Sequence, residues 1–193
     1  MINAYVLTDL GYGDSGKGAT VDYIIREMTS KTLSKIVVRL QGGHQVGHTV
    51  IHNGIHHEFR NFGSGTCQNI ETYYGPETTL CPMAAEIEYD IVYNKFRIIP
   101  KVIYHPDAMI TTEYDIKVNR WEEDNRGDNR HGSVGMGFNK TIERNKKCQF
   151  TAEMMNAPEY IIRMKLNSIR NYYISNGVPS GVFEECNLNW ELS

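Results

Sequence analysis

The sequence predicts an α/β fold, a mostly parallel sheet with helices on both faces and a P-loop-like strand-loop-helix at the N-terminus. Two observations predict it. An apolar run at 4–10 enters a glycine loop at 11–18, and a helix-like segment follows; a second apolar run, at 36–40, enters another glycine-rich loop at 41–49. Strands that alternate with helices indicate a parallel sheet whose ligand sites lie where the strands end.

The first unit is expected to be a buried strand, a tight loop and a helix. Apolar residues after the loop recur at the spacing of one helical face, namely Val21, Ile24, Ile25 and Met28. Successive N–H groups of such a loop converge with those that open the helix, so they favour a bound phosphate, and Lys17 would add a positive charge. The alternative is a tight turn without a ligand.

The spacing of Gly11, Gly16 and Lys17 fits the P-loop pattern up to its last position, where Gly18 replaces the usual Ser or Thr. A metal ion here therefore needs another ligand. The carboxylate of Asp14 is the obvious one, because an acid inside a phosphate loop repels the anion unless a cation or a chemical role offsets it.

Length and composition limit the class of protein. The 193 residues, 40% of them hydrophobic, suit a single domain spanning 1–193. The net charge of −3 gives no bulk attraction to nucleic acid or to an anionic membrane. No apolar run approaches the roughly 18 to 20 residues of a membrane span, and no signal-type segment opens the chain, so a cytoplasmic protein is expected. The four cysteines form no C-x-x-C pair, which favours reduced thiols.

The second glycine loop carries His44 and His48, whose imidazoles can bond or protonate a ligand held against the loop backbone. Next, strands at 49–51 and 55–59 flank Asn53-Gly54, the dipeptide best suited to a type I′ hairpin. Histidines recur every fourth residue from 44 to 56, which on a helix would align metal ligands, but the glycines oppose a helix there. His52, His56 and His57 are therefore interpreted as exposed hairpin residues.

The remaining elements follow from periodicity. The pattern predicts a helix at 82–96 with Met83, Ile87 and Ile91 buried, and a short strand at 101–104. A last helix at 159–175 has Pro158 in its first turn and Gly177 as its end, and a strand is expected at 181–184. The buried row of the last helix is Ile162, Leu166, Ile169 and Tyr173.

Residues 121–147 form a polar stretch that encloses another glycine loop, at 131–137, followed by Lys140, Arg144, Lys146 and Lys147. Two interpretations are open, a solvated mobile loop and an anion-binding loop with arginine support. Composition alone favours the former.

Two motifs together resemble a known family. The stretches Gly13-Asp14-Ser15-Gly16-Lys17-Gly18 and Val38-Arg39-Leu40-Gln41-Gly42-Gly43-His44-Gln45-Val46-Gly47-His48-Thr49 are similar to the N-terminal signature of adenylosuccinate synthetases, ligases that join aspartate to IMP at the expense of GTP. A weaker likeness continues to Phe183-Glu184. It spans the whole chain but only about the N-terminal half of a usual family member.

The resemblance implies roles for particular residues. Asp14 would take the proton from N1 of a 6-oxopurine and bind Mg²⁺ together with the Gly47 carbonyl, and His48 would stabilise the charge as O6 attacks the γ-phosphate. Lys17 would hold phosphates. The implied nucleotide-binding set is Gly13, Asp14, Ser15, Gly16, Lys17, Gly18, Gln45, Gly47, His48, Thr49, Ser133, Arg144 and Asn187, with Arg144 donated across a homodimer.

Departures from the family pattern keep several functions open. Ser15, Ala19 and Gln45 replace the usual glutamate, lysine and asparagine, Glu185-Cys186-Asn187 replaces a Gly-x-Gln segment, and the guanine-recognition and aspartate-binding motifs fall beyond the sequence. The expected function is a ligase that uses GTP or ATP, Mg²⁺, an IMP-like monophosphate and aspartate.

Two alternatives to this ligase remain. The chain could be a purine-nucleotide-binding protein without catalysis, or one completed by a second chain. It could also be a dGMP-aspartate ligase of the related phage family, which replaces the catalytic aspartate retained here as Asp14.

Overall fold

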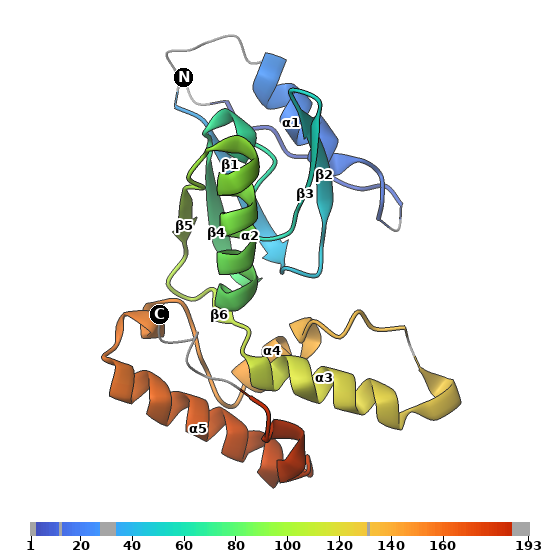
Figure 1. The fold of residues 1–193 in the computed structure, drawn as a ribbon, viewed down its shortest axis with the longest axis vertical. Coiled ribbons are helices and arrows are strands. Elements are labelled where there is room, and N and C mark those ends of the chain that lie inside the picture. Colours follow the sequence, from blue (N-terminus) through green and yellow to red (C-terminus); the bar gives the residue numbers. More distant parts are fainter. Residues whose placement is uncertain (1–2, 12, 28–33, 131, 187–193) are drawn as a thin grey trace.

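The computed structural model describes residues 3–11, 13–27, 34–130 and 132–186, arranged as a sheet unit above a helical unit (Figure 1). The sheet unit contains α1 (Lys17–Glu27), β1 (Ile36–Gly42), β2 (His48–His52), β3 (Ile55–Phe59), β4 (Glu71–Leu80), α2 (Pro82–Phe96) and β5 (Val102–Tyr104). The helical unit contains β6 (Met109–Ile110), α3 (Glu113–Asn125), α4 (Phe138–Asn145) and α5 (Glu159–Ser175). Among the described residues, no helix is both long and apolar enough to cross a bilayer.

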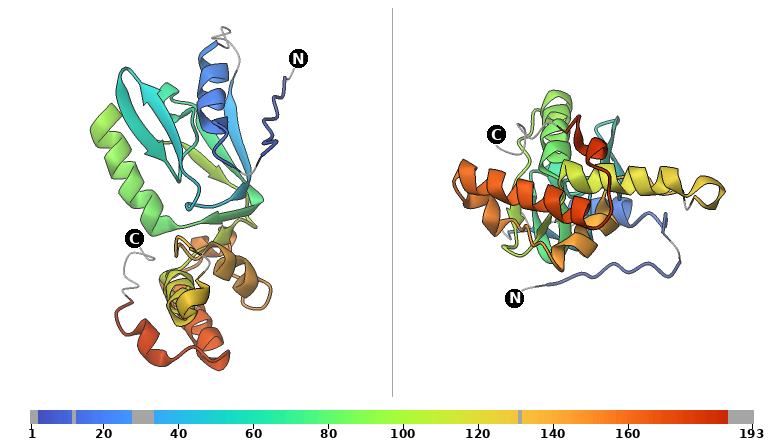
Figure 2. Two further views of the ribbon diagram at one scale, coloured as in Figure 1. Left: turned by 90° about the vertical axis from the view of Figure 1, so that its right-hand side faces the viewer. Right: turned by 90° about the horizontal axis from the view of Figure 1, so that it is seen from below.

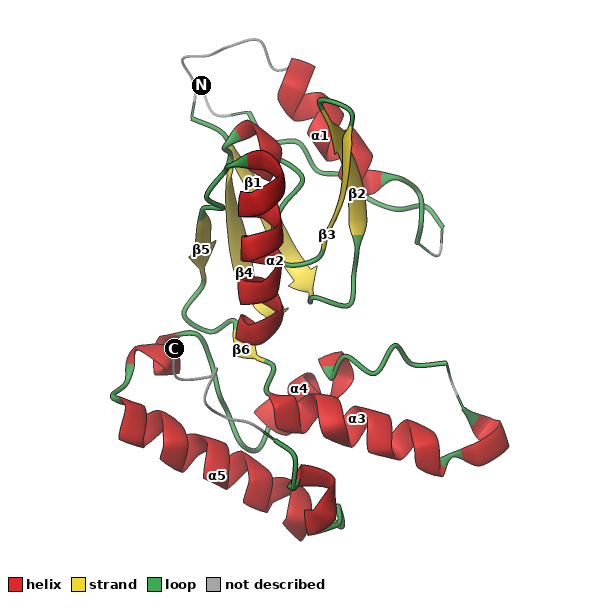
Figure 3. Ribbon diagram, in the orientation of Figure 1, coloured by secondary structure: helices red, strands yellow, loops and turns green. Residues whose placement is uncertain are grey.

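The main sheet is parallel, as expected, and β4 is its central strand. β4 pairs with β1 on one side and with β5 on the other, and β6 continues the pairing at the far end of β4. The strands β2 and β3 form a separate antiparallel hairpin (Figure 3). Its turn residues Asn53 and Gly54 have φ values of 50° and 78°, which confirms the predicted hairpin.

The sequence prediction missed β4 because Gly75 and Pro76 interrupt its middle. Proline removes a donor from the ladder, and both residues are typical of turns. The strand accommodates them by a shift in register, since Arg39 pairs with Tyr74 but Gln41 pairs with Glu77.

The described helices of the sheet unit pack on one face of the sheet. Val92 of α2 lies in a core with Val50, Phe59, Phe62 and Cys67, and α1 lies on the same side (Figure 2). The other face carries Ile36, Val38, Leu40 and Ile103, which are 49%, 50%, 65% and 46% exposed. Within the sheet unit, the described helices therefore cover one face, and the expected helices on both faces are not shown there.

The N-terminal segment is not a strand. Residues 3–11 have no ladder, and Tyr5, Val6 and Leu10 are 59%, 84% and 101% exposed. Polar Thr8 and Asp9 interrupt the apolar run, and the Asp9 carboxylate turns to Lys17 instead. The described residues therefore do not show the expected P-loop, because no strand precedes α1 among them.

The α2 helix has the predicted bounds but buries a different face from the predicted one. Ile87 and Ile91 are 57% and 42% exposed, whereas Glu88 and Val92 are buried. Glu88 faces inward because its carboxylate accepts hydrogen bonds from the backbone N–H groups of residues 60 and 61. These bonds satisfy a buried charge that the apolar periodicity did not reveal.

In the helical unit, the prediction for α5 is confirmed in its bounds and its buried row, all four residues of which are at most 7% exposed. This row packs against Tyr114, Val118, Phe150 and Phe183. The expected strand at 181–184 is wrong: Ser180–Phe183 is a short 3₁₀ helix that buries Phe183. The polar stretch at 121–147 includes the end of α3 and all of α4, so it is more ordered than a solvated loop.

Candidate functional site

The first glycine loop has the conformation that a tight approach to a ligand requires. Gly13, Asp14 and Gly16 have φ values of 113°, 53° and 71°, and α1 begins directly afterwards at Lys17. Left-handed backbone is uncommon for aspartate and permits the sharp turn into the helix. The Asp14 side chain is exposed and makes no hydrogen bond or ion pair with the described part of the chain. The neighbouring Gly13 is exposed too.

The Lys17 ammonium is bound by a residue that the sequence analysis overlooked. Its Nζ lies 2.5 Å from Oδ2 of Asp9, whose other oxygen accepts the N–H of Gly11 at 2.8 Å. The Lys17 hydrogen bond, followed by those from the Ser15 hydroxyl and Gly11, holds the pKa of Asp9 well below its usual value. Asp9 falls within the apolar run from which a strand is expected. Its position eight residues before the lysine is the only sequence signal for this ion pair.

The second glycine loop meets the first through His48. A Cβ placed on Gly18 would lie 2.4 Å from the Cβ of His48, so the start of α1 rests against this imidazole. Its ring stacks on Phe59 at 5.7 Å, and its Nε2 is buried without a partner among the described residues. Burial, followed by the charge of Arg39, lowers the pKa of His48 to about 4, so the ring is neutral at pH 7.

An open cavity of about 650 Å³ lies beside Lys17, and neither Gly18 nor His48 lines it. It is lined by Lys17, Gln41, Gly42, Val46, Glu77, Met109, Phe138 and Ile142. These residues come from α1, the second glycine loop, β4, β6 and α4, and Gln41 and Gly42 among them stand at the carboxyl end of β1. Ligands in open α/β sheets bind at this edge.

The other predicted residues of the second loop border this region. Gln45 is half-buried and its Oε1 has no partner among the described residues, whereas Gly47 and Thr49 are exposed. A Cβ on Gly47 would lie 2.1 Å from the Glu58 carboxylate, which leaves no room for a side chain there.

The third glycine loop is held by α3. The Ser133 hydroxyl is 3.2 Å from Nδ2 of Asn119 and accepts the N–H of Gly135, while Asn119 also accepts the N–H of Gly137. Ser133 does not line the cavity; the loop instead leads into α4, whose Phe138 does.

Arg144 is fully buried inside its own chain. Its guanidinium bonds both oxygens of Asp115 at 3.1 and 2.9 Å and donates to the carbonyls of Ile110 and Cys148 at 2.6 and 3.0 Å. Tyr173 donates to the same carboxylate at 2.6 Å. A side chain that is 0% exposed and bound in this way does not extend to a partner subunit. In place of the expected contribution to a partner's site, Arg144 has a structural role within its own chain.

The expectation of an exposed His57 is also wrong. The ring is 5% exposed and packs edge-on against Phe59 and Phe96, with its Nε2 3.6 Å from Glu88. His56 is exposed, as predicted, and His52 is partly exposed. Asn187 lies outside the described residues.

The residues present fit a magnesium ion. The described residues contain no cluster of three or more His, Cys, Asp or Glu side chains that could form a protein cage. Mg²⁺ usually takes one or two carboxylates and completes its shell with phosphates and water. Among the described residues, the exposed Asp14 carboxylate is free to take that role.

Comparison with known proteins adds the family. The sequence profile described as adenylosuccinate synthetase matches residues 6–183. The adenylosuccinate synthetase of Clostridium beijerinckii is 26% identical over 181 residues, which is 90% of this chain and 41% of that protein. The Clostridium perfringens protein is 26% identical over 179 residues, 90% of this chain and 40% of that one.

Solved structures show a similar fold. The fully ligated adenylosuccinate synthetase of Plasmodium falciparum has a TM-score of 0.70 at 16% identity, over 88% of this chain and 40% of that chain. The cyanophage S-2L succinoaminodeoxyadenylate synthetase, bound to dGMP and dATP, has a TM-score of 0.53 at 15% identity, over 82% and 41%. The chain thus spans about 40% of the length of these relatives. Because the family profile matches nearly all of it, the chain belongs to the adenylosuccinate synthetase family.

Proposed function

We propose that the chain carries the phosphate-binding and base-activating part of a ligase that joins aspartate to an IMP-like monophosphate at the expense of GTP or ATP. The observation that supports this proposal is the contact between Gly18 and His48, which sets the start of α1 against this imidazole. Membership of the family supports the reaction class.

In this function Asp14 accepts the N1 proton of the purine, and O6 then attacks the γ-phosphorus as the bond to the diphosphate breaks. His48, neutral at pH 7, donates a hydrogen bond to the charge that develops during transfer, and Lys17 exchanges Asp9 for a phosphate oxygen. The amine of aspartate then displaces the phosphate from C6. Bound magnesium neutralises phosphate charge; Asp14 and the Gly47 carbonyl would hold it.

A second candidate is nucleotide binding without turnover, or turnover only with a complementing second chain. One observation favours it: the Lys17 charge is already paired with Asp9. A third is a dGMP ligase of the phage type; the phage structure is similar in fold, and Asp14 favours the IMP type.

The decisive experiment incubates the protein with GTP or ATP labelled at the γ-phosphate, Mg²⁺, aspartate, and either IMP or dGMP. We expect labelled phosphate to be released only when a monophosphate is present. Asp14→Asn should reduce this release by about 10²- to 10⁴-fold, because the amide cannot accept the proton. The matched control is Asp128→Asn, which changes an exposed aspartate in another loop.

Calorimetry separates the candidates. Under the ligase proposal, Asp14→Asn still binds the monophosphate, weakened by about 1 to 3 kcal/mol for one hydrogen bond. Triphosphate binding that is tighter in the mutant, insensitive to Mg²⁺ and without turnover in either protein would reject the ligase and support the binding candidate. Light scattering at tens of micromolar (an assay choice) tests the proposed homodimer.

A further inference from the structure

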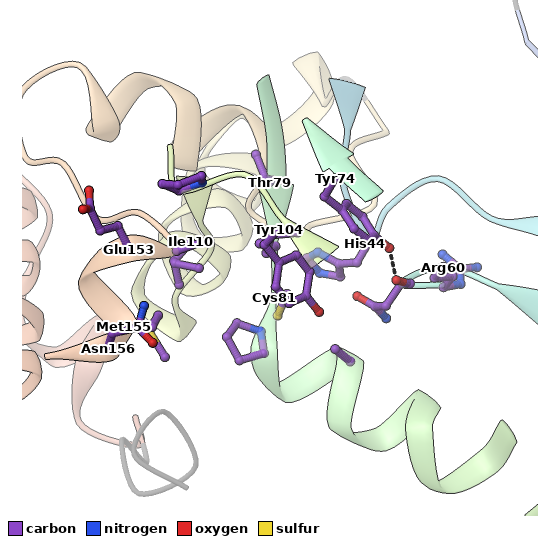
Figure 4. Close-up of a pocket in the computed structure, with 16 residues that line it drawn as sticks. His44, Arg60, Tyr74, Thr79, Cys81, Tyr104, Ile110, Glu153, Met155 and Asn156 are labelled. Atoms are coloured by element: carbon purple, nitrogen blue, oxygen red, sulfur yellow. Dashed lines mark hydrogen bonds between the residues drawn. The ribbon is translucent and has the colours of Figure 1, made fainter. Parts of the chain in front are cut away.

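A second cavity, of about 620 Å³, lies on the other side of β4 and shares no lining residue with the cavity at Lys17. Figure 4 shows it between two groups of side chains. His44, Tyr74, Thr79 and Tyr104 come from the sheet unit, and residues 152–156 face them from the helical unit. Its volume is within the range of about 300 to 1,000 Å³ that is typical of small-molecule sites.

Two polar side chains that line this cavity, His44 and Thr79, have no hydrogen-bond partners in the described chain. His44 is 2% exposed, and neither Nδ1 nor Nε2 makes a hydrogen bond; Thr79 is 1% exposed, and its hydroxyl makes none. Buried polar atoms are nearly always paired in folded proteins. Three unpaired atoms on two neighbouring residues that line one cavity therefore indicate a ligand that pairs with them.

The charges of His44 and Arg60 do not favour an anionic ligand in this cavity. Burial, and secondarily the nearby Arg60, lowers the pKa of His44 to about 4, so its ring is neutral at pH 7 and offers one donor and one acceptor. Arg60 is itself paired with Glu58 at 2.6 Å. Neither group leaves a free positive charge that would require an anion.

The walls are apolar and partly aromatic. Leu80, Pro82, Ala85 and Ile110 line the cavity, and the rings of Tyr74 and Tyr104 lie 5.4 Å apart at one side. Apolar walls with two or three fixed polar groups are typical of small-molecule sites, and the Tyr104 ring, 39% exposed, offers a face on which a planar ring can stack.

We propose that this cavity binds an uncharged planar heteroaromatic compound of one or two fused rings, with a hydrogen-bond donor beside an acceptor, paired to His44 and Thr79. The site is separate from the nucleotide site proposed above and does not depend on it.

The test titrates 7-azaindole into the whole chain at pH 7 and follows binding by saturation-transfer NMR. This compound has an N–H beside a ring nitrogen acceptor, and indole, of the same shape, lacks the acceptor. We expect 7-azaindole to bind about tenfold more tightly than indole, as the loss of one hydrogen bond predicts. His44→Phe and Thr79→Val should each remove most of this preference, whereas His56→Phe, at an exposed histidine, should not.

Ala85→Phe provides a test that leaves both polar residues in place, because its ring would fill the cavity; it should abolish binding of both compounds. Circular dichroism verifies that each variant is folded. Equal binding of 7-azaindole and indole, or unchanged binding to folded His44→Phe or Ala85→Phe, would overturn the proposal. Displacement of 7-azaindole by IMP or GTP would also overturn it, because the probe would then lie in the nucleotide site.

Discussion

Replacement of Arg144 tests whether this arginine stabilises its own chain. The Asp115 carboxylate is 0% exposed, and it accepts hydrogen bonds from the Arg144 guanidinium, the Tyr173 hydroxyl, and the N–H and hydroxyl of Thr112. Arg144→Met would leave this carboxylate buried without its counter-charge. Removal of one partner from a buried ion pair costs about 3 to 5 kcal/mol.

For a chain of this length, 1 kcal/mol changes the melting temperature by about 2 to 4 °C, so we expect a decrease of about 6 to 20 °C. Urea unfolding followed by circular dichroism measures the free energy of unfolding. The matched control is Arg163→Met, whose ion pair with Glu159 is exposed and 2.7 Å long, and which should cost at most about 1 kcal/mol. The double variant Asp115→Leu/Arg144→Met should recover only part of the loss, because it removes both charges but leaves the Tyr173 hydroxyl and the Thr112 N–H without their acceptor.

An Arg144→Met protein as stable as the wild type, but deficient in a dimer-dependent activity, would refute this reasoning. That result would restore the role implied by the sequence resemblance, in which the arginine extends to a partner subunit. A loss of stability that does not depend on protein concentration agrees with the structure instead, since the contacts of Arg144 are all within one chain.

Three further outcomes are expected. Gly18→Ala should weaken triphosphate binding about tenfold or more by calorimetry, because its methyl group would lie 2.4 Å from the Cβ of His48, although alanine favours helices; wild-type affinity would contradict the contact. His44 and His48 have pKa values lowered from 6.5 to about 4, so the unfolded chain binds protons at a higher pH than the folded chain does. The free energy of unfolding should therefore be highest above pH 6.5 and fall as the pH drops towards 4. A free energy of unfolding in urea that does not vary over this window would contradict the prediction. Glu88→Gln should lower the free energy of unfolding by about 1 to 3 kcal/mol, against a negligible effect of the exposed Glu86→Gln; equal effects would show that the buried hydrogen bonds contribute little.

Elements whose signals are local could be predicted from the sequence. The α5 helix has Pro158 at its start, Gly177 after its end and one apolar row, and the hairpin turn needs only Asn53-Gly54. The bounds of α2 were likewise local, but its buried face was not. That face depends on Glu88 and the backbone of residues 60 and 61, which are distant in the sequence.

The candidate site was predictable in part. The start of α1 meets His48 as expected, but not for the expected reason, because residues 3–11 form no strand that could end at the sheet edge. The partners of the charged residues were not predictable, because the pattern around Lys17 does not reveal Asp9, and Arg144 finds Asp115 across 29 residues. The local sequence around Arg144 would be equally compatible with an arginine that faces the solvent.

The central position of β4 has a consequence for the folding kinetics. Its first half lies between β1 and β5, whereas its end pairs with β6, so one strand belongs to both the sheet unit and the helical unit. Ile36 pairs with Glu71, and the parallel ladder must therefore close a loop of about 35 residues before its first bond forms. The sheet unit cannot complete its packing until that closure occurs, and the backbone amides of residues 72–74, which lie between β1 and β5, should be among the last to exchange with deuterated solvent.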